Sequence, residues 1–150
     1  MSNTMSTPTV GASQVNRVEL SLAADAQMLF LARMTVAAVA SRANFAYEEV
    51  EDLRLAIDEL CIRLMGSSTG VARISLLFQW SDDGTLDVMG TRIPAGGPST
   101  NGHHPHPDGS GPALELSERI LDALVEEHGA DMIGTTHRAW FRMRRQGHPG

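Results

Sequence analysis

The chain has 150 residues, of which 42% are hydrophobic and 20% charged, a composition that fits one folded domain and excludes a disordered or fibrous protein. All 12 basic residues are arginine, which excludes lysine-dependent chemistry such as Schiff-base formation and the Walker A phosphate grip. The net charge of −6 argues against direct nucleic-acid binding, and no apolar run reaches the roughly 18 residues that span a membrane, so a cytoplasmic protein is predicted.

The ends of the chain are predicted to lie outside the folded domain. Residues 1–16 are rich in Ser, Thr and Asn and show no periodicity, which indicates a disordered tail. Regular patterning follows, so we expect one domain over residues 17–145 and a second short tail over residues 146–150.

Alternation of apolar and polar residues from Arg17 to Leu22 predicts a half-buried strand. Asp25 can then cap a helix that runs to about Arg42. This helix is apolar almost all round, which predicts that it is extensively buried.

A second helix is predicted from about Tyr47 to Met65, because apolar residues recur at three- and four-residue steps, and the single cysteine, Cys61, lies on this apolar stripe. Cys61 is therefore expected in the core and not as a nucleophile. Acidic residues crowd the first turn, where the helix dipole favours negative charge. We interpret them as a solvated helix start, with a docking patch for a basic partner as the alternative.

Residues 72–80 and 85–88 flank an Asp-Gly turn and predict a hairpin. Residues 94–111 are rich in Pro, Gly and His, cannot sustain a helix or strand, and are predicted to form a long flexible lid. The lid histidines have poor spacing for zinc, so no metal site is predicted, although a metal-sensing lid is an alternative. These histidines are His103, His104 and His106.

A third helix is predicted from Pro112 to about His128, ended by Gly129, and a closing strand pair over residues 131–133 and 137–143. Helices with one apolar side need a sheet to cover. The order of elements therefore predicts an α+β fold, a two-layer α/β sandwich whose mostly antiparallel, mixed sheet is covered on one face by three helices.

The run from Asp52 to Met65 (DLRLAIDELCIRLM), together with this order of elements, resembles the Bergerat-fold, histidine-kinase-like ATPases. Within them it is similar to the small anti-sigma factor and serine-protein kinase family (RsbW-type), over about residues 17–145. The resemblance implies that Glu59 is the catalytic general base, which takes the proton from an attacking serine hydroxyl or water. Arg63 stands where the family has its magnesium-binding Asn, one helical turn from Glu59, and there it could bind phosphate oxygens or pair with Glu59.

Two further family signatures imply cofactor-binding residues. Gly90 stands where the family's adenine-binding Asp is expected. The segment with Gly111, Ala113 and Leu114 resembles a phosphate-binding signature in which small residues open a helix, with plain helix capping as the alternative that ordinary helix-start chemistry favours. Thr135 matches the family's closing Gly-Thr, with an ordinary turn as the alternative.

The resemblance implies an anti-sigma factor that sequesters an alternative RNA polymerase sigma factor in a stress response. An anti-anti-sigma factor protein would counter it, and the chain would form a homodimer. ATP and Mg²⁺ would be the cofactors if the chain phosphorylates a serine of that partner. The alternative is a degenerate, non-catalytic protein-interaction module on the same scaffold, which switches by partner competition only.

Overall fold

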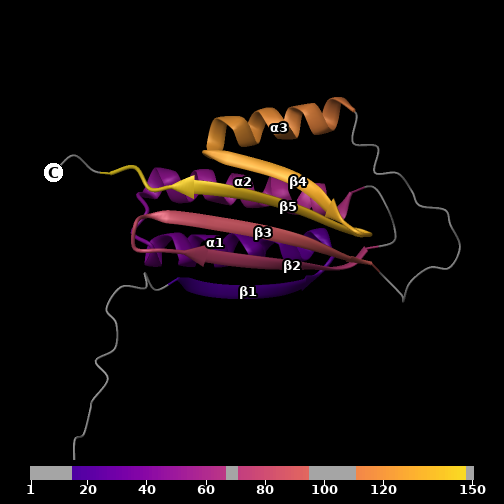
Figure 1. The fold of residues 1–150 in the computed structure, drawn as a ribbon, viewed down its shortest axis with the longest axis horizontal. Coiled ribbons are helices and arrows are strands. Elements are labelled where there is room, and N and C mark those ends of the chain that lie inside the picture. The colour runs from indigo at the N-terminus through magenta and orange to yellow at the C-terminus, as the bar shows by residue number, and fades with distance from the viewer. Residues whose placement is uncertain (1–14, 67–70, 95–110, 148–150) are drawn as a thin grey trace, which may run out of the picture.

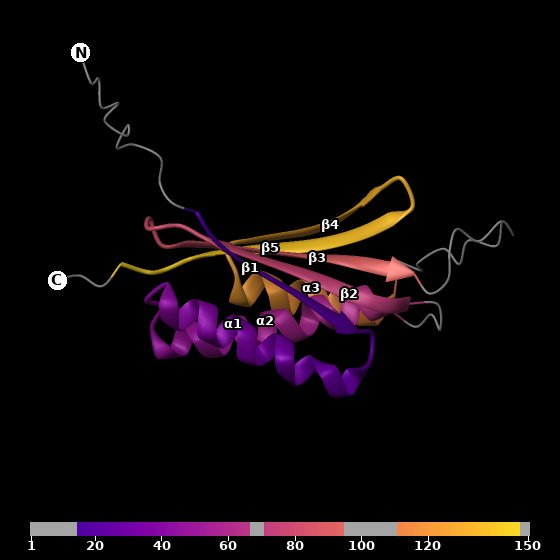
Figure 2. The ribbon, with the colours of Figure 1, turned by 90° about the horizontal axis from the view of Figure 1, so that it is seen from below.

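A computed structural model of the chain describes residues 15–66, 71–94 and 111–147, which form two layers (Figure 1). One layer is a five-stranded sheet and the other consists of the helices, which all lie on the same side of the sheet (Figure 2). The strands are β1 (Asn16–Ala23), β2 (Val71–Trp80), β3 (Thr85–Pro94), β4 (Glu127–Ile133) and β5 (Thr136–Arg144). The helices are a short 3-10 turn, η1 (Ala26–Met28), and α1 (Leu29–Arg42), α2 (Tyr47–Met65) and α3 (Pro112–Leu124).

The strands follow the order β1-β2-β3-β5-β4, and all four pairings are antiparallel. The predicted two-layer α/β sandwich is confirmed, with an antiparallel sheet throughout the described strands rather than a mixed one. The reason is that α1 and α2 return the chain to the end of the sheet where β1 finishes, so β2 runs back beside β1. Among the residues that the structure describes, no helix has the length and hydropathy needed to cross a bilayer.

The core lies between the helices and one face of the sheet. The alternation predicted for β1 is confirmed, since Leu22 is buried and its neighbours Ser21 and Ala23 are exposed. The largest fully buried side chains come from α2 and from β2, β3 and β5, and they include Leu53, Ile57, Leu60, Phe78, Leu86 and Phe141. The observed β3 extends six residues beyond its predicted end, because it pairs with β2 along one edge and with β5 along the other.

The start of the first helix agrees with its prediction, but its burial does not. The Asp25 carboxylate accepts a hydrogen bond from the backbone N–H of Gln27 at 2.9 Å, at the N-terminus of η1. The predicted extensive burial of α1 is wrong, because Phe30 and Met34 are 50% and 61% exposed. Only one stripe of α1 packs against α2 and the sheet, so its apolar residues on the other side face solvent.

The second helix has the predicted bounds, and Cys61 is in the core as expected. Its first turn, however, is not entirely solvated. The Glu49 side chain is buried and its two carboxylate oxygens accept hydrogen bonds from the backbone N–H groups of Ala46 and Gln146, both at 2.7 Å. Glu49 thus joins the start of α2 to the chain just after β5.

The third helix is shorter than predicted. It ends at Leu124, and β4 begins at Glu127, so Gly129 lies inside a strand and does not end the helix. The cause is tertiary: β4 pairs with β5, and Gly129 lies opposite Trp140. A Cβ at position 129 would be 2.8 Å from Cζ2 of Trp140, so the indole ring covers the place where a side chain would stand.

Candidate functional site

Glu59, the predicted catalytic base, lies on α2 one turn before Arg63, and both side chains are half-buried. Arg63 does not pair with Glu59. Its Nη2 atom is instead 3.6 Å from Oε1 of Glu118 on α3, because α3 packs beside the last turns of α2. The side chain of Glu59 makes no hydrogen bond or ion pair within the part of the chain that the structure describes.

The residue at the expected adenine position, Gly90, lies buried on β3 between β2 and β5 and faces α2. A Cβ at this position would be 2.3 Å from Cδ1 of Leu64 and 3.2 Å from Cδ2 of Leu76. Real Cβ atoms do not approach a neighbour this closely, so leucine side chains fill the space that a carboxylate would need. Position 90 offers neither an acceptor for an adenine amino group nor room for one.

The residues of the expected phosphate signature lie at the start of α3. Gly111 is the N-cap and Pro112 the first helical residue, as is common at helix starts. The backbone N–H groups of Leu114 and Glu115 donate to the Gly111 carbonyl at 3.0 and 3.2 Å. Ala113 is exposed.

Thr135 is exposed in the tight turn between β4 and β5, where Ile133 pairs with Thr136 and Gly134 has a φ of +62°. This turn, the start of α3 and the end of β3 lie at the same end of the sandwich (Figure 1). Residues 95–110 of the lid predicted over residues 94–111, with its three histidines, lie outside the described residues, as do residues 1–14 of the tail predicted over residues 1–16. Asn16, the last residue of that predicted tail, is the first residue of β1.

Two titratable residues near this end were missed by the sequence analysis. Arg92 lies on β3, two residues after the helix-facing Gly90. His137 lies on the neighbouring β5, two residues before the helix-facing Ala139. Burial, and then the charge of Arg92, hold the pKa of His137 below its usual value of 6.5. Strand alternation counted from Gly90 could have placed Arg92 on the same side of the sheet.

Metal binding and nucleophilic thiol chemistry find no support in the described residues. No group of His, Cys, Asp or Glu within the described ranges is arranged to hold a metal ion. Burial, and then the charge of Asp58, raise the pKa of the Cys61 thiol to about 12, so it is not a thiolate at neutral pH.

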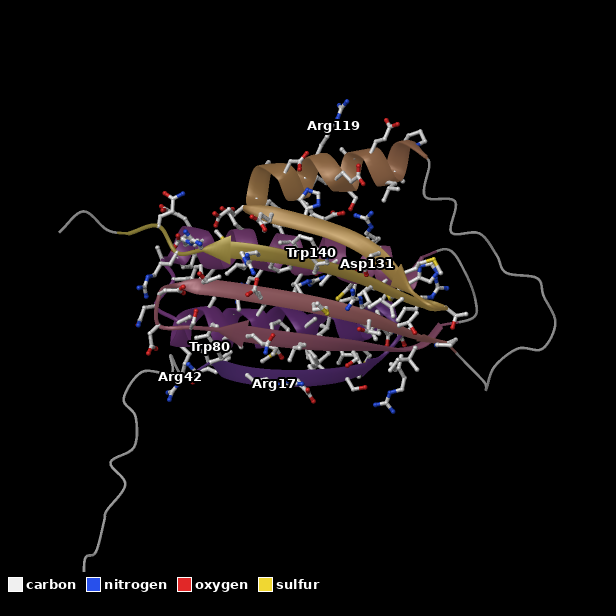
Figure 3. The ribbon with its side chains drawn as sticks, in the orientation of Figure 1. Arg17, Arg42, Trp80, Arg119, Asp131 and Trp140 are labelled. Atoms are coloured by element: carbon white, nitrogen blue, oxygen red, sulfur yellow. The ribbon has the colours of Figure 1, made fainter. Side chains whose placement is uncertain are left out.

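The described part of the chain has a hollow of about 380 Å³ on the face of the sheet that carries no helix. Leu77, Met89 and Trp140 are among its apolar lining residues, and Asp87, Glu127, Arg138 and Arg142 are its charged ones. Figure 3 shows Trp140 and Asp131, labelled on β5 and β4, on this side of the sheet. β4 pairs with the outer edge of β5, so Trp140 does not lie on an edge strand of the sheet.

Comparison with known proteins agrees with the resemblance found in the sequence. The chain is 32% identical over 75 residues to Serine-protein kinase RsbW of Bacillus cereus (strain AH187), and the proteins of that name from Bacillus thuringiensis subsp. konkukian (strain 97-27) and Bacillus mycoides (strain KBAB4) match at the same identity. The match covers 49% of this chain and 46% of each relative, so the similarity spans about half the length of these curated relatives. No protein-family model matches the chain. Over about half of its length, this chain is therefore similar to the RsbW serine-protein kinases.

Proposed function

We propose that this chain is an RsbW-type anti-sigma factor that works as a protein-binding module without nucleotide. In this proposal it sequesters an alternative sigma factor in the cytoplasm, as a homodimer, and an anti-anti-sigma protein displaces the sigma factor by competition. The similarity to RsbW kinases supports the family role. The observation that supports the non-catalytic form is the 2.3 Å approach of Leu64 to the Cβ position of Gly90.

ATP with Mg²⁺ does not fit the residues present at the positions the family would use. At position 90 the adenine-binding carboxylate is missing and its space is filled. At position 63 a guanidinium replaces a metal ligand and is paired with Glu118, and a fixed cation repels Mg²⁺. Glu59 is the one catalytic signature that is retained, and a general base has no role without a bound phosphate donor.

A switch based on competition needs no chemistry on either partner. If the sigma factor and the anti-anti-sigma protein bind overlapping surfaces, their relative concentrations and affinities decide which complex forms. Phosphorylation in trans is then unnecessary for release. Arg63 would then act only in holding α2 against α3 through Glu118, and Glu59 would have no catalytic role.

The test is displacement of the sigma factor from the purified chain by the unphosphorylated anti-anti-sigma protein, with and without ATP and Mg²⁺. We expect the same displacement curve in both conditions, and an unmodified partner by mass spectrometry. Calorimetric titration of the chain with ATP and Mg²⁺ should give no binding heat. Saturable binding with a dissociation constant near micromolar, or a phosphoserine on the partner, would instead establish the kinase.

Two variants separate the explanations if nucleotide does bind. Glu59→Ala should abolish phosphorylation in a kinase but leave displacement unchanged in a competitive module. Arg63→Asn restores the family's metal ligand, and it should not create ATP turnover while Leu64 still fills the adenine side of the site.

A further inference from the structure

The hollow on the helix-free face of the sheet has an apolar floor that contains a tryptophan. Trp140 lies on this face (Figure 3), and its register partner on β4 is Gly129. A Cβ at position 129 would be 2.8 Å from Cζ2 and 3.1 Å from Nε1 of Trp140, so the indole ring extends over β4. Strand register continues the floor from Trp140 to Met89 and then to Leu77.

The charged side chains around this floor are paired with one another. Nε of Arg142 is 2.6 Å from Oδ1 of Asp87, and its Nη1 is 3.8 Å from Oε2 of Glu127. Nε and Nη2 of Arg138 are 2.9 and 2.6 Å from the two carboxylate oxygens of Asp131. A charged ligand would have to displace one of these partners and leave a charge without compensation. The pairing therefore favours a neutral ligand.

Polar groups remain available to such a ligand. Gln79 lines the hollow, and its side-chain amide makes no hydrogen bond within the described ranges. Nη1 of Arg138 lies 4.0 Å from Sδ of Met89, beside the apolar floor, and has no oxygen acceptor in the same part of the chain. Guanidinium groups donate, carboxylates accept, and the Gln79 amide does both. This combination suits hydroxyl groups, which are donors and acceptors at once.

We infer that this hollow binds a neutral saccharide, with one pyranose ring stacked on Trp140. A pyranose has a face of C–H groups, which the electron-rich face of an indole attracts. Its hydroxyl groups surround that face. The volume of about 380 Å³ lies within the range of about 300–1,000 Å³ that is usual for small-molecule sites. The inference does not depend on the proposed function, because it involves neither a sigma factor nor its antagonist.

The positions of the polar groups favour a saccharide over a nucleoside. Arg142 follows Trp140 by two residues on β5 and Arg138 precedes it by two, so polar groups flank the indole about 7 Å away in both directions. A pyranose has hydroxyl groups on opposite sides of its ring and can use both flanks. A nucleobase is joined to ribose at one edge, so it can use only one flank.

The first experiment follows the indole N–H resonances of the two tryptophans by NMR during titration of the purified chain. The probes are the methyl glycosides of glucose, galactose, mannose and N-acetylglucosamine, together with maltose. At least one should shift the Trp140 resonance saturably, with a dissociation constant of about 1 mM. Trp80 does not line the hollow, so its resonance should stay unchanged. No saturable shift of Trp140 with any probe would overturn the inference, as would saturable binding of adenosine alone.

The second experiment compares variants with the probe that binds best. Trp140→Ala should weaken binding at least about tenfold, and Trp140→Phe should lie between this variant and the wild type because it retains an aromatic face. Gln79→Ala should weaken binding about threefold to tenfold through the lost hydrogen bond. Trp80→Phe is the matched control and should keep the wild-type affinity. Equal affinities of Trp140→Ala and Trp80→Phe would contradict the assigned site.

The third experiment tests whether the ligand must be neutral. The uronic acid and the amino sugar related to the best probe carry a negative and a positive charge on the same ring. Each should bind at least about threefold more weakly than the neutral sugar, because each competes with an existing ion pair. Tighter binding of either charged sugar would show that the hollow selects charge, and it would overturn the inference.

Discussion

At the scale of single residues, the absence of a side chain at Gly90 is what lets Leu64 pack where a nucleotide-binding carboxylate would otherwise stand. The position lies on β3, directly under α2, and Leu64 reaches to 2.3 Å from where a Cβ would stand. One missing carbon thus lets a leucine enter the part of the fold where the family resemblance implies an adenine-binding carboxylate. The packing of one hydrophobic residue thereby supports a binding module over an enzyme.

Gly90→Ala should lower the free energy of unfolding by about 1–3 kcal/mol, because the added methyl group overlaps Leu64 in a closely packed core. Urea denaturation measures the loss. The double variant Gly90→Ala, Leu64→Ala should cost less than the sum of the single changes, since the two side chains compete for one space. Gly147→Ala is the control, because a Cβ there meets no atom within 4 Å. An additive double variant would contradict the overlap.

His137 predicts a pH dependence of stability. Its pKa in the folded chain is held below the usual 6.5 by burial and by Arg92. At a pH between the lowered pKa of the folded chain and the usual 6.5 of the unfolded chain, His137 binds more protons in the unfolded chain. The stabilising contribution of neutral His137 is therefore complete above about pH 6.5 and is lost as the pH falls toward the lowered pKa. Unfolding free energies of the wild type should therefore fall between about pH 7 and pH 5, and His137→Gln should fall less. Parallel curves for the two proteins would rule out this role for His137.

At the scale of elements, Glu49 shows how a helix start acquires a tertiary function. Ala46, the N-cap of α2, has no side-chain acceptor, and Glu49 accepts its backbone N–H as in a capping box. The same carboxylate accepts the N–H of Gln146, which is 97 residues away. One buried charge thus joins the helical layer to the end of the sheet.

Glu49→Ala should destabilise the chain by about 2–3 kcal/mol, because hydrogen bonds to a charged acceptor contribute about 1.5–3 kcal/mol and two N–H groups lose theirs. Glu48→Ala, on the exposed neighbour, should stay within about 0.5 kcal/mol of the wild type. Hydrogen exchange at the Gln146 amide provides the local measurement. Equal losses for the two variants would show that only the charge of the first turn matters.

At the scale of the whole molecule, the two faces of the sheet differ in what covers them. The helices bury one face, and within the described residues no element covers the other. Apolar residues remain on that uncovered face at the centre of an ordered charge pattern. A partner that covers this face would remove Leu77, Met89 and Trp140 from water, and such burial favours association.

Thermal stability should therefore depend on protein concentration. Dimerisation stabilises the folded state by mass action, so the Tm of the wild type should rise as the chain is concentrated. Scanning calorimetry at several concentrations measures this dependence, and a constant Tm for the wild type would contradict the homodimer of the proposed function.

The sequence by itself determined the features that depend on neighbours along the chain. The alternation of β1, the apolar period of α2, the cap at Asp25 and the Asp83-Gly84 turn are all local. They predicted the layers of the sandwich, and the four-residue spacing placed Glu59 and Arg63 on one side of α2.

Only the tertiary structure decided the features that depend on residues far apart in the sequence. Pairing with β5 turned the predicted end of α3 into the start of β4, and the packing of α3 gave Arg63 its partner Glu118. The filling of the space at Gly90 depends on Leu64, which is 26 residues away, and the two meet only when α2 lies on the sheet. Caps and periodicity act over one or two turns, whereas burial and ion pairing depend on which elements come together.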